Sequence, residues 1–438
     1  MALGGGSWTA QNKILPGSYI NFVAASRATS LLGERGFVAM PFVMSWGKEG
    51  EVFKVTAEDF QKNALKIFGY AYGSDELLSI RELFLNAKTL YAYRLGTSTK
   101  ATCNYATAVC GGVRGNDLKI VITALTNGEV ATGFNVKTML DTAVVDSQDV
   151  IFAVGESSAT TDKLNDNDFV VWTESVELSA GTTPLSNGAD ASVTAEDYSE
   201  FLNKIEPFNF NVIGYAGEDA SIKALFAAFT KRMRDERGVK FQCVLHKYEE
   251  ADYEGVISVE NNVTAELVYW TVGASAGCAV NQSNTNRLYN GTVKIDVDYT
   301  QEQLTDAILA GKFIFHRVGD DVRVLEDVNT LVTTTDEKNE DFKANQTIRV
   351  LDQIGNDIAT IFNTRFLGII PNDKSGRISL WNEIVKHHQE LQTVRAIENF
   401  KPEEVKVEAG DSKKSVVVYD VVTPTNCMSQ LYMSCVIQ

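Results

Sequence analysis

Helices and strands alternate along two stretches of this chain, and that alternation constrains the fold more than any other feature. Between residues 191 and 335 the hydrophobic periodicity predicts helices and strands in turn. The predicted elements are helices at 194–204 and 219–237 and strands at 208–214, 239–246 and 255–259. This alternation indicates a largely parallel sheet with helices on its faces. Residues 31–96 carry similar elements, so we expect 31–96 and 191–335 to form one discontinuous α/β domain.

Local capping signals fix where some of these helices begin. Thr56 precedes an acidic turn that contains Asp59, and Thr194 precedes a similar turn that contains Asp197. Such residues satisfy the free backbone N–H groups of the first helical turn. We therefore expect one helix to run from Thr56 towards Phe68 and another to start at Thr194.

The segment between the two α/β stretches differs in composition. Residues 97–190 are rich in Thr, Ala, Val, Asn and Asp, and short β-prone runs alternate with turn residues. Between residues 97 and 185 there are eleven Asp or Glu against five Lys or Arg. Short, regularly spaced strands are typical of a sandwich. The sequence therefore predicts an acidic β-sandwich inserted into the α/β domain and facing solvent.

The last part of the chain, 336–438, predicts a separate α+β domain. Two long helices are expected at 344–366 and 375–397, with a break at 368–373 that contains Pro371. Strands are expected at 405–408, 415–422 and 428–437. The final strand would place an open sheet edge at the C-terminal end.

Both ends of the sequence carry β-prone runs that have no obvious partner. A strand must pair its backbone N–H and C=O groups, and a terminal strand can do so by extending the sheet of a neighbouring molecule. We expect residues 1–30 to form an arm with a donor strand at about 18–23, and we expect a second donor strand at the other end. Pairing within the same subunit remains the alternative for both. The residues predicted to link subunits are Ser18, Tyr19, Ile20, Asn21, Phe22, Val23, Leu431, Tyr432, Met433, Ser434, Cys435, Val436 and Ile437.

Charge and cysteine content exclude several classes of protein. The chain of 438 residues has 40 Lys and Arg against 57 Asp and Glu, which gives a net charge of −17. Such an acidic protein is a poor partner for nucleic acid. The sequence has no apolar window long enough to cross a membrane and does not begin with a secretory signal. Its six cysteines form no CxxC pair, so we expect reduced thiols in a cytosolic setting, no metal site and no cofactor.

One motif raises the possibility of catalysis. Gly273, Ser275 and Gly277 match GxSxG, which in α/β serine hydrolases lies between a strand and a helix. Here the preceding residues predict a helix that continues through the motif, so we favour a structural role. A hydrolase centred on Ser275 remains the alternative.

Two other polar pairs invite a metal interpretation that the sequence does not favour. Asp296 and Asp298 would share one face of a predicted strand, but two carboxylates alone bind a divalent ion weakly. His387 and His388 are adjacent on a predicted helix, where they would point in different directions on its surface and could not chelate together.

Several short strings, in order along nearly the whole chain, resemble the contractile tail sheath proteins of myophages, Gram-positive prophage-like particles and contractile bacteriocins. They lie at 16–22, at 35–41 with Trp46 and Gly47, at 290–298, at 327–331, at 346–352 and at 421–433. The resemblance implies a subtilisin-like topology for the α/β domain and strands exchanged between subunits in the C-terminal domain. It also implies a structural subunit with no enzymatic activity, which forms stacked hexameric rings around a rigid tube and contracts to drive that tube through a target envelope.

The resemblance further implies the partners of the chain. They would be other copies of itself, the inner tail tube protein, and baseplate and tail terminator proteins, without nucleic acid and without membrane insertion. Assembly would occur in the bacterial cytoplasm, before release of the particle. The C-terminal domain would face the tube, and its basic residues would contact it: Arg349, Arg365, Lys374, Arg377 and Lys386. The alternatives are a solvated helix surface with pairs to Asp352, Asp357 and Glu390, or a static shell that never contracts.

Overall fold

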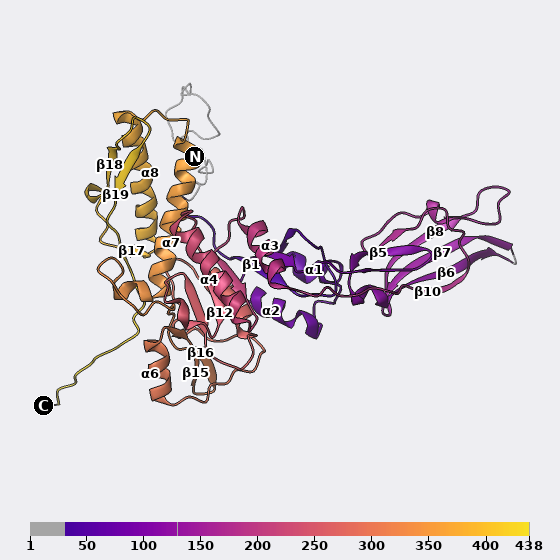
Figure 1. Ribbon diagram of the computed structural model, residues 1–438, viewed down its shortest axis with the longest axis horizontal. Coiled ribbons are helices and arrows are strands. Elements are labelled where there is room, and N and C mark those ends of the chain that lie inside the picture. The colour runs from indigo at the N-terminus through magenta and orange to yellow at the C-terminus, as the bar shows by residue number, and fades with distance from the viewer. Residues whose placement is uncertain (1–30, 129, 438) are drawn as a thin grey trace, which may run out of the picture.

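The computed structural model describes residues 31–128 and 130–437 and shows an elongated molecule (Figure 1). A β-sandwich lies at one end, an α/β body lies in the middle, and two long helices lie beside the body at the other end. The C-terminal segment leaves the body as an extended stretch of chain that belongs to no sheet. The predicted N-terminal arm, with its donor strand at 18–23, lies outside the described residues.

A seven-stranded sheet forms the centre of the body. Its strand order is β14-β13-β12-β11-β1-β3-β2, and all neighbours run parallel except β2 and β3. The strands are β1 (Phe37–Phe42), β2 (Val52–Thr56), β3 (Thr89–Arg94), β11 (Val212–Tyr215), β12 (Gln242–His246), β13 (Val256–Val259) and β14 (Lys312–Phe313). The expectation of a mixed α/β fold with a largely parallel sheet is confirmed. Strands from both predicted stretches share this sheet, while the exact domain boundaries stay a prediction.

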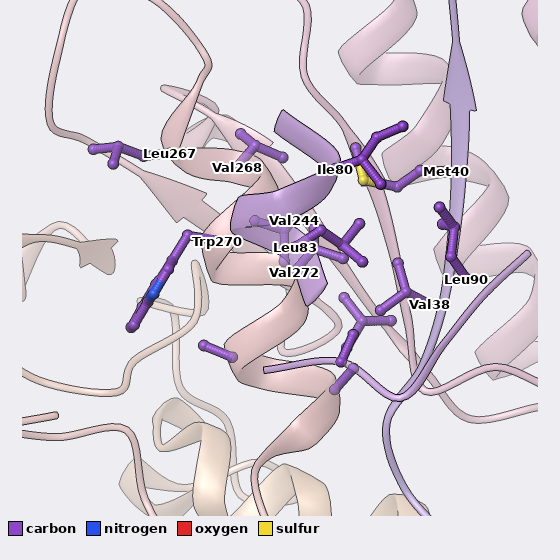
Figure 2. Close-up of a cluster of buried hydrophobic side chains, with 14 of the residues drawn as sticks. Val38, Met40, Ile80, Leu83, Leu90, Val244, Leu267, Val268, Trp270 and Val272 are labelled. Atoms are coloured by element: carbon purple, nitrogen blue, oxygen red, sulfur yellow. The ribbon is translucent and has the colours of Figure 1, made fainter. Parts of the chain in front are cut away.

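Helices cover both faces of the sheet because successive strand residues point in opposite directions. Val38 and Met40 of β1 pack beneath α1 (Ala57–Phe68), α2 (Leu78–Phe84) and α5 (Leu267–Gly277). Figure 2 shows this cluster, in which Val272 of α5 lies close to Leu83 of α2 while the ring of Trp270 points away from Leu83. Ala39 faces the other core, beneath α3 (Ala195–Ile205) and α4 (Ala220–Asp235). The body therefore has three layers with a dry core on each side of the sheet.

The predicted helix starts are confirmed in detail. At α1, Thr56 Oγ1 accepts from the N–H of Asp59 at 3.1 Å, while Asp59 Oδ2 accepts from the N–H of Thr56 at 3.3 Å. The same reciprocal box joins Thr194 and Asp197 at α3. Gly238 adopts a positive φ of 75° just beyond α4, a conformation that glycine reaches without a steric penalty.

The inserted segment forms two sheets that share one core. The larger is ordered β10-β6-β7-β8 and the smaller β4-β5-β9. The strands are β4 (Lys100–Thr102), β5 (Ala106–Gly111), β6 (Leu118–Asn127), β7 (Val130–Leu140), β8 (Ala143–Ile151), β9 (Val170–Trp172) and β10 (Gly181–Pro184). Ile120 and Val136 of one sheet share a buried cluster with Ala108 and Val170 of the other. This is the arrangement expected of a sandwich.

The C-terminal part contains α7 (Asn345–Ile361), a π-helical turn (Phe362–Phe366) and α8 (Lys374–Thr393). Two small antiparallel pairs accompany them, formed by β17 (Ile397–Glu398) with β20 (Thr423–Pro424) and by β18 (Lys406–Ala409) with β19 (Val416–Tyr419). Helix α6 (Gln301–Leu309) and the hairpin of β15 (Phe315–Val318) with β16 (Asp321–Val324) lie at the lower edge of the body (Figure 1). Within the described ranges, every helix is too short or too polar to cross a membrane.

The predicted strand through Asp296 and Asp298 is wrong, because side chains rather than a neighbouring strand satisfy its backbone. Asn261 Nδ2 donates to the carbonyl of Asp296 at 2.7 Å, and the N–H of Asp296 donates to Asn262 Oδ1 at 2.8 Å. Ile295 and Val297 are buried in the core, which explains the strand-like pattern. Asp298 pairs with Arg317. The described residues contain no cluster of three or more His, Cys, Asp or Glu that could hold a metal ion.

Candidate assembly surface

The C-terminal segment exposes apolar side chains that soluble proteins usually bury. Thr425 is held by Ala396 and Cys427 by Gln346, through backbone N–H groups at 3.0 Å in each case. Beyond Cys427 six large apolar side chains are between 76% and 101% exposed. They are Met428, Leu431, Tyr432, Met433, Val436 and Ile437. Contiguous exposed apolar surface of this kind marks a site of association.

This segment forms no strand in the described chain, so the predicted strand at 428–437 is wrong for a single subunit. A strand needs a partner for its backbone groups, and the segment projects away from the body where no partner lies (Figure 1). Its β-prone side chains remain consistent with pairing to another molecule. Donation to a neighbour therefore stays a prediction.

A second exposed β element lies on the outside of α8. Strands β18 and β19 pair only with each other among the described residues. Trp381 of α8 anchors this region by donating Nε1–H to the carbonyl of Val405 at 2.9 Å. Val417, Val418, Tyr419 and Val421 are each more than a third exposed. A two-stranded element with open edges and exposed apolar residues can accept a further strand.

A buried ionic joint connects these C-terminal elements to the α/β body. Arg234 of α4 donates two hydrogen bonds to Asp352 of α7, at 2.6 and 2.8 Å, and both side chains are at most 8% exposed. Gln242 of β12 donates to Asn345 of α7 at 2.8 Å. Burial lowers the pKa of the Arg234 guanidinium, and Asp352 more than offsets this, so the pKa lies above its usual value. The Arg234 guanidinium is therefore charged at neutral pH, and its two Nη atoms bind a carboxylate from another segment of the chain, while its Nε has no partner among the described residues.

Arg349 belongs to the same joint, which overturns its predicted role on the tube-facing surface. Its side chain is 1% exposed and pairs with Asp327, which is equally buried. Burial alone would raise the pKa of Asp327, but Arg349 and hydrogen bonds from Asn284 and Asn345 hold it below its usual value. The sequence placed Arg349 on a helix correctly, but the charge faces the body.

The other four basic residues predicted to face a tube lie on or near the surface. Arg365 pairs with Glu383, and Arg377 donates to Asn372 Oδ1 at 2.9 Å. Lys374 and Lys386 are exposed on α8. The alternative partners Asp352 and Asp357 bind Arg234 and His387 respectively, so neither pairs with these four basic residues, and their contact with a tube stays a prediction.

His387 and His388 are fully buried, which corrects the expectation that they lie on a helix surface. His387 Nε2 lies 3.0 Å from Asp357 Oδ2, and His388 Nε2 lies 2.8 Å from Asp420 Oδ2. Helix α8 packs against α7 on one side and the chain after β19 on the other, and each imidazole faces one of them. The two rings bind different carboxylates, as expected for adjacent positions on a helix.

Ser275 has the surroundings of a structural residue. It lies within α5, is fully buried and its Oγ has no hydrogen-bond partner. A Cβ at Gly273 would lie 2.2 Å from the carbonyl oxygen of Leu83, and one at Gly277 would lie 2.0 Å from that of Asn86. The glycines of the motif therefore allow the end of α2 to pack directly on α5. The predicted helical context is confirmed, and the strand that a nucleophile elbow requires is absent at this position.

Comparisons with known proteins assign the chain to a family. Residues 35–95 match the N-terminal region of domain III of tail sheath protein Gp18, residues 191–330 match the phage tail sheath protein central domain, and residues 337–438 match the phage tail sheath C-terminal domain. The chain is also 32% identical to phage-like element PBSX protein XkdK of Bacillus subtilis (strain 168), over 98% of this chain and 99% of that protein.

Solved structures agree with these matches. The sheath tail protein of Desulfitobacterium hafniense is 36% identical and superposes with a TM-score of 0.79 over 94% of this chain and 97% of that one. The helical sheath of the anti-feeding prophage in its contracted state is 12% identical, with a TM-score of 0.57 over 97% of this chain and all of that one, and it shares the fold. The resemblance drawn from the short sequence strings is confirmed, and this chain belongs to the phage tail sheath protein family.

Proposed function

We propose that this chain is the repeating subunit of a contractile tail sheath, stacked as hexameric rings around an inner tube. The exposed apolar C-terminal segment, together with the open edges of β18 and β19 elsewhere on the C-terminal part, is the observation that carries the proposal. Within ranges 31–128 and 130–437, each subunit has a β-prone segment with no strand partner and a pair of strands with no third strand. A neighbour in the sheath would complete both, with strands exchanged between subunits at both ends of the chain.

The other partners and the setting are part of the same proposal. An inner tail tube protein would lie against the C-terminal domain, and baseplate and terminator proteins would hold the two ends of the cylinder. Assembly would take place in the bacterial cytoplasm. The α/β body would have the subtilisin-like topology implied by the family resemblance and no enzymatic activity, consistent with the burial of Ser275.

The test replaces exposed apolar residues of the C-terminal segment and leaves every buried core residue unchanged. Tyr432→Asp with Val436→Asp introduces two charges at side chains that are 88% and 87% exposed. We expect a folded subunit that stays monomeric, because charge and lost apolar contact both oppose strand pairing between copies. The matched control is Val130→Asp with Val154→Asp, at side chains of the sandwich that are 68% and 107% exposed. Sedimentation and negative-stain microscopy should show cylinders for the control. Normal cylinders from the variant of the C-terminal segment would contradict the proposal.

The same microscopy separates a contractile sheath from a static shell. A contractile sheath should yield both long and short striated cylinders. A static shell should yield cylinders with a single axial repeat under all conditions.

The tube-facing role of the four remaining basic residues has its own test. Neutralising Arg365, Lys374 and Lys386 together should leave polymerisation of the sheath intact but weaken its assembly on tubes, most visibly at low salt, because high salt already screens these exposed charge contacts in the unmodified protein. Normal sheathing of tubes at every ionic strength would show that these are ordinary surface charges.

A further inference from the structure

An unassigned cavity lies where the order of strands in the central sheet reverses direction. From β1 the sheet grows on one side through β3 and on the other through β11, β12, β13 and β14. The loops after β1 and β11 therefore leave in different directions, and parallel sheets bind ligands in the crevice that forms at such a point. A cavity of about 300 Å³ opens here, lined by Phe42 at the end of β1 and by Tyr215 at the end of β11.

Four aromatic side chains from separate elements contribute to the wall. Tyr198 of α3 and Tyr269 of α5 join Tyr215 and Phe42 around the cavity. The ring centroids of Tyr198 and Tyr215 are 5.3 Å apart and nearly perpendicular, and those of Phe42 and Tyr269 are 6.1 Å apart and stacked. These contacts hold the rings against one another, and residues of the loops after β1 and β11 complete the lining.

The polar groups of the cavity are acceptors and neutral hydroxyls, with one full charge. Glu76 supplies the only charged side chain among the described lining residues, and Ser79 lies beside it. Burial raises the pKa of Tyr198 and of Tyr269 to about 12, so their phenols stay neutral at physiological pH. A cation entering this space would therefore meet a carboxylate, hydroxyl oxygens and aromatic rings, whereas for an anion the hydroxyl donors would be opposed by the negative charge of Glu76.

We propose that this cavity binds a guanidinium or ammonium group carried on an alkyl stem. The carboxylate of Glu76 would accept its N–H groups, and aromatic rings attract cations that lie within about 6 Å of their centroids. The apolar wall would cover the stem. The volume is at the lower end for ligand sites, which fits a single side chain or a small amine and excludes a nucleotide-sized cofactor. The cation would come either from a free amine or from a Lys or Arg side chain of a neighbouring copy.

The experiment uses the full-length free subunit and n-butylguanidinium as the probe, with neutral n-butylurea as its isostere. Calorimetric titration should show saturable binding of the cation and at least about tenfold weaker binding of the urea. Glu76→Gln should weaken binding of the cation by about two- to fivefold, because the Glu76 side chain is exposed and an exposed charge contact contributes less than a buried one. The matched control is Glu58→Gln, an exposed carboxylate on α1 that does not line the cavity and whose loss should leave binding unchanged. Equal affinity of the wild-type protein and Glu76→Gln, or no saturable binding, would overturn the proposal.

A second measurement distinguishes the two sources of the cation. If a neighbouring side chain fills the cavity, assembled cylinders will not take up the probe, and excess probe will slow polymerisation of the wild-type protein more than that of Glu76→Gln. If a free amine fills it, cylinders will bind the probe as the free subunit does. Binding is measured before assembly, so its failure would leave the proposed sheath function untouched.

Discussion

Removing one charge from the buried joint between α4 and α7 should have a large and local effect. Asp352→Asn keeps the shape of the side chain but leaves the guanidinium of Arg234 buried without a counter-charge. Both side chains are at most 8% exposed, so water cannot replace the lost carboxylate without opening the joint. Breaking a buried ion pair from one side typically costs about 3–5 kcal/mol. The expected loss is at the upper end for a single substitution.

Hydrogen exchange followed by mass spectrometry measures this loss by segment. A cost of about 3 kcal/mol corresponds to exchange about 100-fold faster, since each 1.4 kcal/mol is a factor of ten. We expect this acceleration in α4 and α7 and little change in β6 and β7 of the sandwich. Because the chain has several parts, one global unfolding free energy would average over this difference.

Two further variants sharpen the interpretation. Glu383→Gln removes the half-exposed pair with Arg365 and should accelerate exchange in α8 by less than about fivefold. Arg234→Met with Asp352→Leu removes both charges and should recover most of the lost protection, because apolar replacements of a whole buried pair are often neutral. Exchange in α7 that is unchanged in Asp352→Asn would refute the view that this pair holds the joint together.

Three other outcomes are expected. Gly277→Val should prevent correct folding, since its Cβ would lie 2.0 Å from the carbonyl oxygen of Asn86. Ser275→Ala should change the unfolding free energy by no more than about 1 kcal/mol. Thermal denaturation of soluble protein would check both, and covalent labelling of Ser275 by a fluorophosphonate would contradict its structural role. The pKa of Asp327 is below its usual value in the folded state. The ionised Asp327 carboxylate therefore stabilises the fold fully above about pH 4, and this stabilisation is lost as pH falls further. Unfolding midpoints measured between about pH 6 and 3 should fall steeply in the wild-type protein and less steeply in Asp327→Asn. Replacing the sandwich by a short Gly/Ser linker should preserve cylinders of smaller outer diameter, and complete loss of assembly by an otherwise folded protein would argue against a peripheral sandwich.

The sequence predicts those parts of the fold that depend on local chemistry. The reciprocal bonds at Thr56 and Asp59 involve residues three apart, and the alternating core of the parallel sheet follows from side-chain periodicity. The helical context of Ser275 was also evident from the residues before it. These features need no knowledge of distant segments.

The sequence fails where a distant segment decides the environment. Arg349, His387 and His388 lie on helices as predicted, but their carboxylate partners are 22, 30 and 32 residues away, so local charge patterning suggested exposure instead of burial. Arg234 and Asp352 are 118 residues apart, and no local signal joins them. The apolar run at the C-terminal end indicates an intermolecular role, and it forms no strand with the residues of its own subunit that the structure describes.

The exposed C-terminal segment also sets a condition on how subunits can meet. Two free copies each carry a net charge of −17, so they repel one another over the distance at which salt does not yet screen their fields. The proposed strand pairing between copies would act only at contact, and its free energy would depend on the correct alignment of many backbone groups. A growing end that already holds several subunits in register can therefore capture another copy more readily than two free copies can start a new nucleus. If the exposed C-terminal segment pairs with a neighbouring copy as proposed, cylinders of this acidic protein would grow from an existing end rather than by spontaneous clustering of free copies.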